Sequence, residues 1–336
     1  MMTIIDAHSS SAILNDNKRI TYIDAAKAFF MMVIVLDHTG CVEPFPLAFS
    51  CEVPAFILLS GFFFSADLPI GKFVEKKIRT ILVPFVAFYV ISYVLFYVGK
   101  LIYPFIANMT EAKGFTDLFT QKQLFNGPLW FLLCLFWNQL IMFGVVRNFK
   151  GQYVRLTFIM LLGVCGCLLG YYQVFLPLFF DTALSTMPFF YAGFILRKHK
   201  VFCHIDIKST FILLFSCAIF LFVFPYAKSQ PSLNSWYNVF IATWVIYPII
   251  IITVTTLCKL FRGGVMAWIG KNTLYIMCTH HLVYRPIRLV ISQFVTSTDL
   301  CSCLVFVFTM LVVCSTIPFV NKYMPWIVGK FDKPIQ

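Results

Sequence analysis

The residues that could do chemistry stand close together near the N-terminus. An apolar run at residues 25–36 contains one lysine, Lys27, follows Asp24 and ends at Asp37 and His38. Ionisable side chains at membrane depth cost free energy, so each one is a candidate site residue. In an α-helix, Lys27 and His38 share a face because eleven residues make about three turns, and Asp24 lies on the same side. One helix face therefore carries an acid, a base and an imidazole.

Two of these side chains also have structural interpretations. Lys27 lies about one turn inside the helix and can extend to the lipid headgroups, so both roles stay open. Asp24 fits a first helical turn, where a carboxylate interacts favourably with the helix dipole, and we favour this role over catalysis. For His38 we expect function, because a neutral imidazole is a suitable general base at neutral pH. We take His38 and the adjacent Asp37 as the candidate catalytic pair.

Two further candidates lie near the starts of later apolar runs. Glu52 begins the segment EVPAFILLSGFFF and is interpreted either as a binding residue or as a solvated acid at the membrane rim. Trp130 follows Pro128, which suits a first helical turn, and its ring is typical of an anchor at the membrane interface. We include both among the candidate substrate-binding residues. In the same segment as Glu52, residues 60–61 (Ser-Gly) predict a close helix–helix approach rather than a nucleophile.

A basic cluster precedes the third apolar run. Its members are Lys72, Lys76, Lys77 and Arg79. Such a cluster binds lipid headgroups, which is its commoner role, or the phosphates of an anionic substrate. Arg79 and Lys76 are the candidates for contact with the phosphates of such a substrate.

A late apolar run carries the adjacent pair His280 and His281. Neighbouring residues on a helix project about 100° apart, so we expect at most one of these rings to face a given cavity. Core hydrogen bonding and ligand contact are both open for them. The twelve cysteines show no Cys-x-x-Cys or Cys/His metal spacing, and we interpret them as small buried apolar residues. We therefore predict no bound metal or cofactor.

The composition defines the kind of molecule that must hold these residues. Of 336 residues, 60% are hydrophobic and 12% are charged, and the mean hydropathy is +0.86. Soluble domains are about one quarter charged. The net charge of +12 would indicate nucleic acid binding in a soluble protein, but here the sites of the charges matter more. We predict a polytopic membrane protein that binds no nucleic acid and has no cleavable signal peptide.

Windows of about twenty apolar residues predict an all-α bundle of ten transmembrane helices. The spans lie near residues 23–42, 46–66, 79–103, 126–146, 155–175, 182–196, 209–227, 236–258, 268–290 and 301–320. We divide the chain into a short tail (1–20), one bundle (21–322) and a second tail (323–336). The longest outer connection, about residues 104–125, is interpreted as an interfacial helix, a lid or a plain connector.

The basic residues set the predicted orientation. With the N-terminus inside, nineteen of the 26 Lys and Arg residues fall on the cytoplasmic side of the ten spans and six fall outside. This excess follows the positive-inside rule. Both termini are therefore expected in the cytoplasm, and the protein in the cytoplasmic (inner) membrane.

Several segments together resemble one known family, the acyltransferase 3 family of integral membrane O-acyltransferases that modify carbohydrates. The resemblance covers about residues 18–330. The segments, in chain order, are YIDAAKAFFMMVIVLDHTG, VPAFILLSGFFF, KKIRTILVPF, GPLWFLLCLF, DTALSTMPFFYAGFILRKH and WIGKNTLYIMCTHHL.

The resemblance implies a ten-helix bundle, a cytoplasmic acyl-CoA donor, typically acetyl-CoA, and an acceptor hydroxyl on a surface or lipid-linked saccharide. The family's basic residue, ten further residues and catalytic His correspond to Lys27 and His38, and a late His corresponds to His280. Many members have Arg at the first position. Lys27 lacks the two-pronged guanidinium for binding phosphate. The residue before the His is often small in the family, whereas here it is Asp37.

Two other functions stay open on the sequence alone. A transporter or flippase for a lipid-linked saccharide would also use ionisable groups inside the membrane, although the chain shows no inverted repeat. A non-catalytic membrane sensor could use the same scaffold. The acceptor sugar, the acyl chain and the oligomeric state are not predicted.

Overall fold

A computed structural model describes residues 20–41, 51–102, 119, 124, 126–205, 207–223, 244, 246–260 and 264–331. Every regular element in these ranges is a helix, which confirms the all-α prediction. The elements are α2 (Thr21–His38), α4 (Glu52–Phe62), α5 (Ile70–Lys77), η1 (Ile78–Leu82), α6 (Val83–Ile102), η2 (Gly127–Leu129), α9 (Trp130–Asn148), α10 (Gln152–Tyr171), η3 (Pro177–Phe179), α11 (Phe180–Lys198), α12 (Val201–His204), α13 (Ile207–Val223), α14 (Tyr247–Leu257), η7 (Cys258–Leu260), α15 (Gly264–Lys271), α16 (Thr273–Ile291), α17 (Thr298–Tyr323) and η8 (Pro325–Val328).

Five helical stretches in the described ranges are long and apolar enough to cross a bilayer. They are Ile70–Gly99, Gly127–Asn148, Gln152–Tyr171, Pro177–Lys198 and Thr298–Tyr323. Each overlaps one of the predicted spans. Two shorter apolar stretches, Glu52–Phe62 and Tyr247–Leu260, overlap two more. The protein is therefore a multi-pass membrane protein. The connection at about 104–125 lies outside the described residues except for positions 119 and 124.

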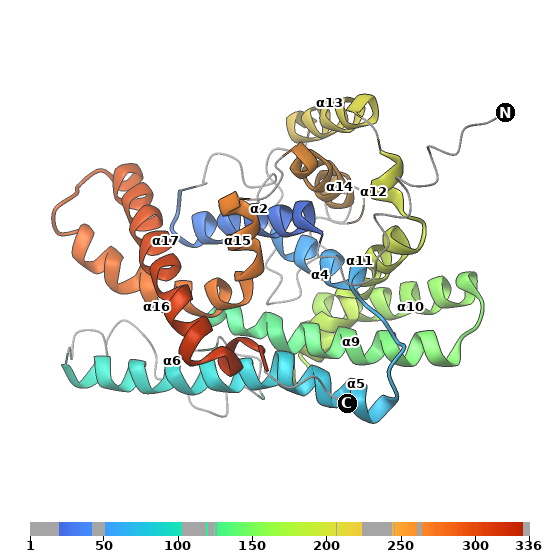
Figure 1. Cartoon of the computed structure of the whole chain (residues 1–336), viewed down its shortest axis with the longest axis horizontal. Helices are drawn as coiled ribbons and strands as arrows, with labels where there is room; N and C mark the ends of the chain where they lie inside the picture. Colours follow the sequence, from blue (N-terminus) through green and yellow to red (C-terminus); the bar gives the residue numbers. More distant parts are fainter. Residues whose placement is uncertain are drawn as a thin grey trace.

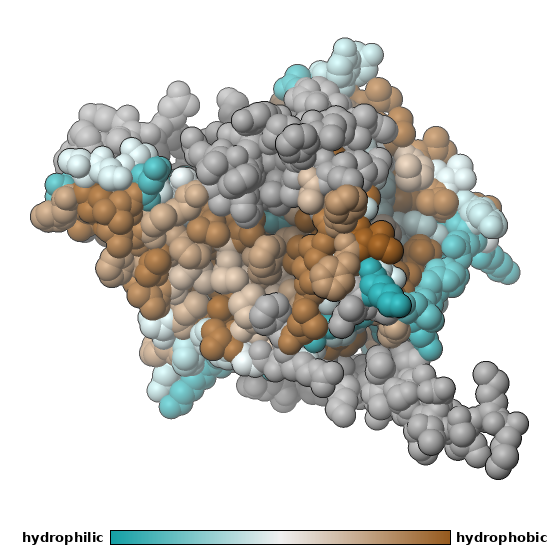
Figure 2. Space-filling model, turned by 90° about the horizontal axis from the view of Figure 1, so that it is seen from above, coloured by the Kyte–Doolittle hydropathy of each residue, from teal (hydrophilic) through white to brown (hydrophobic). Residues whose placement is uncertain are grey.

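The exposed surfaces of several helices are apolar, as expected for surfaces that contact lipid. Leu161, Val164 and Leu168 are exposed along α10, and Leu311 and Phe319 along α17. Figure 2 shows hydrophobic residues over much of the described surface on the side it displays, with hydrophilic residues gathered toward its edges. Exposed side chains of this kind are stable in hydrocarbon rather than in water.

Helix α2 lies at the centre of the molecule (Figure 1). It packs against α15, α4, α16 and α14. Helix α11 packs against α4 and also contacts α10 and α9, and α16 pairs with α17. The long stretch from α5 through η1 to α6 runs along the lower edge in Figure 1. The central position gives α2 neighbours from the first and the last parts of the chain.

Two glycines, one on each helix, allow α4 and α11 to approach closely. A Cβ atom at Gly61 of α4 would lie 1.9 Å from the backbone oxygen of Phe190, and one at Gly193 of α11 would lie 1.8 Å from that of Leu58. A side chain of any size is excluded at such a distance, so the two backbones touch through their glycines. The close approach predicted at Ser60 and Gly61 is confirmed.

The predicted single span at 268–290 is two helices, with the break at Asn272. Its side chain donates Nδ2 to the backbone oxygen of Trp268 at 2.8 Å and accepts hydrogen bonds at Oδ1 from Asn321 and Lys330. Lys330 also donates to Asn321 Oδ1 at 2.7 Å. These contacts join the α15–α16 break to the end of the chain. A hydropathy window did not separate the two helices because the apolar residues on both sides outweigh the short polar stretch from Lys271 to Thr273.

Candidate active site

The end of α2 places His38 at a helix terminus. The chain leaves the helix through Gly40, whose φ of +68° lies in the left-handed region that glycine adopts at little cost. The Cys41 amide donates to the Leu36 carbonyl at 3.1 Å, which closes the pattern of a glycine-terminated helix. His38 therefore stands on the last turn, at the edge of a rigid element.

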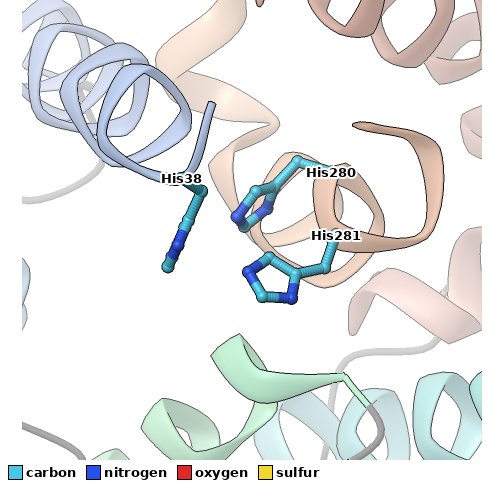
Figure 3. A group of neighbouring side chains, drawn as sticks. All are labelled: His38, His280 and His281. Atoms are coloured by element: carbon cyan, nitrogen blue, oxygen red, sulfur yellow. The ribbon is translucent and has the colours of Figure 1, made fainter. Parts of the chain in front are cut away.

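Helix α16 brings two more imidazoles to the same place. The ring centroids of His38 and His280 are 5.3 Å apart and stacked, and those of His38 and His281 are 4.4 Å apart, edge to face. His280 and His281 lie 5.1 Å from each other at an angle of 81°. Figure 3 shows the three rings gathered between the end of α2 and α16.

We expected at most one of His280 and His281 to face a given cavity, yet both rings lie against His38. The two rings do diverge along α16, as the helical geometry requires. His38 comes from a different helix and lies in the space between the two directions, so both rings reach it. The angular argument considered one helix by itself. It did not include a residue from a second helix that could lie between the two ring directions.

The hydrogen bonds of the three rings leave several nitrogens available. His280 Nδ1 lies 2.9 Å from the Ile276 carbonyl oxygen. A carbonyl can only accept, so Nδ1 carries the proton and Nε2 carries the lone pair. His280 Nε2 and both nitrogens of His281 are buried and have no hydrogen-bond partner among the described residues. A cluster with free lone pairs can accept and pass on a proton.

The same three side chains could hold a metal ion. One nitrogen from each lies within 4.8 Å of the others. Neutral imidazoles suit zinc and related metals. Sequence spacing could not indicate this possibility, because the ligands come from helices at opposite ends of the chain.

A small cavity of about 50 Å³ adjoins His38. Its walls are Ile34, His38, Val53, Phe56, Pro128, Trp130, Phe131 and Met277. Trp130 is buried there, with its ring packed against Phe131 and Phe179, so its predicted place as an exposed interface anchor is corrected. Aromatic walls beside an imidazole exclude water from the space around it.

The segment just before α9, which includes η2, packs against α16. Asn126 is buried and donates Nδ2 to the Cys278 carbonyl at 2.6 Å and to Ser92 Oγ at 3.2 Å. A Cβ at the next residue, Gly127, would lie 3.4 Å from His281 Cε1. The segment that the sequence singled out around Pro128 thus supports the two histidines of α16.

Charged residues border the cluster at the end of α2. Asp37 is exposed and lies within electrostatic range of His38 and Glu52. Glu52 Oε2 is buried without a hydrogen-bond partner in the described part, which disagrees with the interpretation of Glu52 as a solvated rim acid. Arg285, one turn beyond His281, acts electrostatically on both His38 and His281. Arg285 is one of the six basic residues that the predicted topology places outside.

Lys27 and Asp24 lie toward the other end of α2. The Lys27 amine lies 4.5 Å from the centre of the Phe63 ring. Asp24 is buried in the first turn, and its backbone oxygen would meet a Cβ on Gly270 of α15 at 1.8 Å. The structure therefore separates these residues from His38 along the helix, as their spacing of several turns requires.

Lys76 and Arg79 belong to a separate surface. Lys76 is exposed, and Arg79 pairs with Glu75 at 2.7 Å with its guanidinium 5.7 Å from the Phe331 ring centre. Within the described ranges, no hydrogen bond, ion pair or ring contact joins either residue to the three histidines. A cavity of about 620 Å³ on α10 and α11 is also lined by residues other than these histidines.

Comparison with known proteins gives one match. The model of the acyltransferase 3 family, described as an acyltransferase domain, matches residues 20–319. No curated protein and no solved structure matches the chain. The matched range includes all of the candidate residues discussed above.

Proposed function

Because the chain belongs to the acyltransferase 3 family, we propose that it is a membrane O-acyltransferase, in particular an O-acetyltransferase. The donor is a cytoplasmic acyl-CoA, acetyl-CoA, used as a co-substrate. The acceptor is a hydroxyl group of an extracytoplasmic or lipid-linked saccharide.

The meeting of three imidazoles beside an aromatic-walled cavity supports this proposal most strongly. His38 lies against His280 and His281, and lines the cavity together with Trp130 and Phe131. Acyl transfer to a hydroxyl needs a group that removes the hydroxyl proton and later returns one to the leaving thiolate. A neutral histidine performs both steps without a net change.

In the proposed step, a ring nitrogen of His38 accepts the proton of the acceptor hydroxyl. The oxygen attacks the thioester carbonyl, the C–S bond breaks, and the CoA thiolate leaves and receives that proton. His280 and His281 offer their own nitrogens to the imidazolium while it exists. Asp37, next to His38, stabilises the same positive charge.

An alternative route gives the same overall reaction. His38 itself takes the acyl group from the thioester, releases CoA and then passes the group to the acceptor oxygen. The route requires a free nitrogen on His38 and a path from each side of the membrane. Either route gives His38 the central role.

The remaining candidate residues have proposed binding roles. Lys76 and Arg79 attract the CoA phosphates at the inner surface, and Lys27 and Asp24 border the route from there along α2. Glu52 offers a buried carboxylate oxygen that a sugar hydroxyl can donate to. Trp130 offers an aromatic wall to the sugar.

The proposal includes the ten-span topology with one bundle at residues 21–322 and both tails in the cytoplasm. In that arrangement α2 begins inside and ends outside, so His38 lies toward the acceptor side. The membrane is the cytoplasmic (inner) membrane. The excess of basic residues on the inner segments supports this orientation.

The test is acetyl transfer by purified protein carrying His38→Ala. Loss of a general base typically costs about 10²–10⁴-fold in rate, and we expect kcat to fall in that range while binding of acetyl-CoA persists. His199→Ala, at an exposed position after α11, is the matched control and retains activity.

Three results would redirect the proposal. Wild-type transfer by His38→Ala removes His38 from the reaction. Absence of any acyl transfer or acyl-CoA hydrolysis by the folded wild-type protein, together with movement of a lipid-linked saccharide, favours a transporter or flippase. Absence of both activities favours a sensor.

A further inference from the structure

Two thiols from opposite ends of the chain meet beside the last turn of α2. The Sγ atoms of Cys41 and Cys303 are 3.8 Å apart. Cys41 follows His38 by three residues, and Cys303 lies near the start of α17. Cys303 is exposed and Cys41 is half-buried, so a reagent can reach them.

The backbones that carry these thiols are held together by contacts that do not involve sulfur. Arg288 of α16 donates Nη2 to the Thr39 carbonyl at 2.5 Å. At Gly40 an added Cβ would lie 3.4 Å from Ser302 Oγ, next to Cys303. The approach of the two cysteines is therefore a result of how α2 packs on α16 and α17.

The remaining distance is small. A disulfide needs sulfur atoms about 2.05 Å apart, and rotation of two cysteine side chains changes a sulfur position by more than the difference. The two residues are separated by most of the chain, so their meeting does not follow from nearness in sequence. The pair is distinct from the Cys-x-Cys spacing of Cys301 and Cys303.

We propose that Cys41 and Cys303 form a disulfide bond that ties the end of α2 to the start of α17. The inference rests on the orientation given under the proposed function, in which both residues face the extracytoplasmic side. Disulfides form and persist in such compartments, where disulfide oxidoreductases accept electrons from thiols.

The bond forms by exchange with the disulfide of such a carrier. One cysteine thiolate attacks a carrier sulfur, making a mixed disulfide and releasing one carrier thiol. The other cysteine thiolate attacks the mixed disulfide, which makes the Cys41–Cys303 bond and releases the second carrier thiol. Two protein thiols are oxidised and one carrier disulfide is reduced to two thiols.

The bond would hold the last turn of α2 without entering the site. Cys41 is outside the group of side chains that line the His38 cavity. Its attachment to α17 restrains the short segment between His38 and Cys41. The disulfide thus restrains the end of α2 that carries the proposed general base, His38.

The test is peptide mapping of the full-length protein, with free thiols blocked at cell lysis. We expect the peptides of Cys41 and Cys303 as one cross-linked species, lighter by two hydrogen atoms than their sum, which separates after reduction. In Cys41→Ser the Cys303 thiol should be free to the blocking reagent. Cys301→Ser, the matched control two residues from Cys303, should keep the cross-link.

Recovery of both thiols in the blocked form, even after treatment with oxidised glutathione, overturns the proposal. A cross-link from Cys41 to Cys301 also overturns it. Detection of the cross-link does not depend on catalysis. A protein that has the cross-link but no acyltransferase activity would therefore support the disulfide and contradict the proposed function. After reduction, an impermeant maleimide should label both cysteines on intact cells. Labelling only after permeabilisation overturns the orientation and the disulfide together.

Discussion

At the scale of single residues, the two histidines of α16 are not equivalent. His280 donates Nδ1 to its own helix and stacks on His38, whereas His281 meets His38 edge to face with both nitrogens unpartnered in the described part. The hydrogen bond fixes the orientation and tautomer of His280. His281 retains a choice of which nitrogen carries its proton. In the proposed mechanism this difference makes it the better relay partner for His38.

His281→Phe separates the two contributions of that ring. Phenylalanine keeps an aromatic ring in the pocket beside Gly127 but removes both nitrogens. If His281 assists the charged imidazolium, kcat should fall by about 10-fold, the usual effect of losing one hydrogen bond to a charge, with little change in thermal stability. His204→Phe, at an exposed position of α12, is the control. Unchanged kcat in His281→Phe limits His281 to packing.

The sequence predicted His38 because an imidazole at the end of an apolar run is conspicuous. It did not predict that His281 joins the cluster, since that depends on where α2 lies relative to α16. It also misjudged Trp130. A tryptophan at this position is typical of an anchor at the membrane interface, but its ring packs against Phe131 and Phe179. Contacts between residues distant in the chain are not visible in local patterns.

At the scale of elements, the positions of helices follow from local sequence, and their ends often do not. Apolar windows predicted α9, α10, α11 and α17 close to their observed places. The division of α15 from α16 depends on hydrogen bonds from Asn321 and Lys330 to Asn272, which lie far along the chain. A hydropathy window contains no information on such bonds.

The α4–α11 contact offers a test of helix packing. Gly61→Ala introduces a Cβ 1.9 Å from the Phe190 backbone oxygen, and no rotamer relieves a clash with backbone. We expect the helices to separate and the unfolding temperature in detergent to fall by several degrees, since such overpacking costs about 1–3 kcal/mol.

Gly144→Ala on α9 is the matched control, because nothing lies within 4 Å of the added Cβ. Alanine is the better helix former by about 1 kcal/mol, so this variant should be unchanged or slightly more stable. A Gly61→Ala protein as stable as Gly144→Ala contradicts the close packing of α4 on α11.

At the scale of the whole molecule, the apolar exterior and the distribution of basic residues predict how the protein is oriented across the membrane. If both tails are cytoplasmic, acetyl-CoA reaches the protein only from the inner surface. Sealed inside-out vesicles should therefore release CoA from added acetyl-CoA, and sealed right-side-out vesicles should not until they are made permeable. Equal rates in both sealed preparations contradict the proposed sidedness, and His38→Ala vesicles give the background rate.

The candidate site joins the first described helix to one of the last. During synthesis the ribosome delivers α2 long before α16 exists, and domains fold from the N-terminal end as they emerge. His38 therefore has no imidazole partner through most of translation, and Asn272 gains Lys330 only at the very end. A nascent chain that is released early lacks the paired imidazoles however well its earlier helices are inserted. Biogenesis thus delivers the complete cluster of three histidines only with a nearly complete polypeptide.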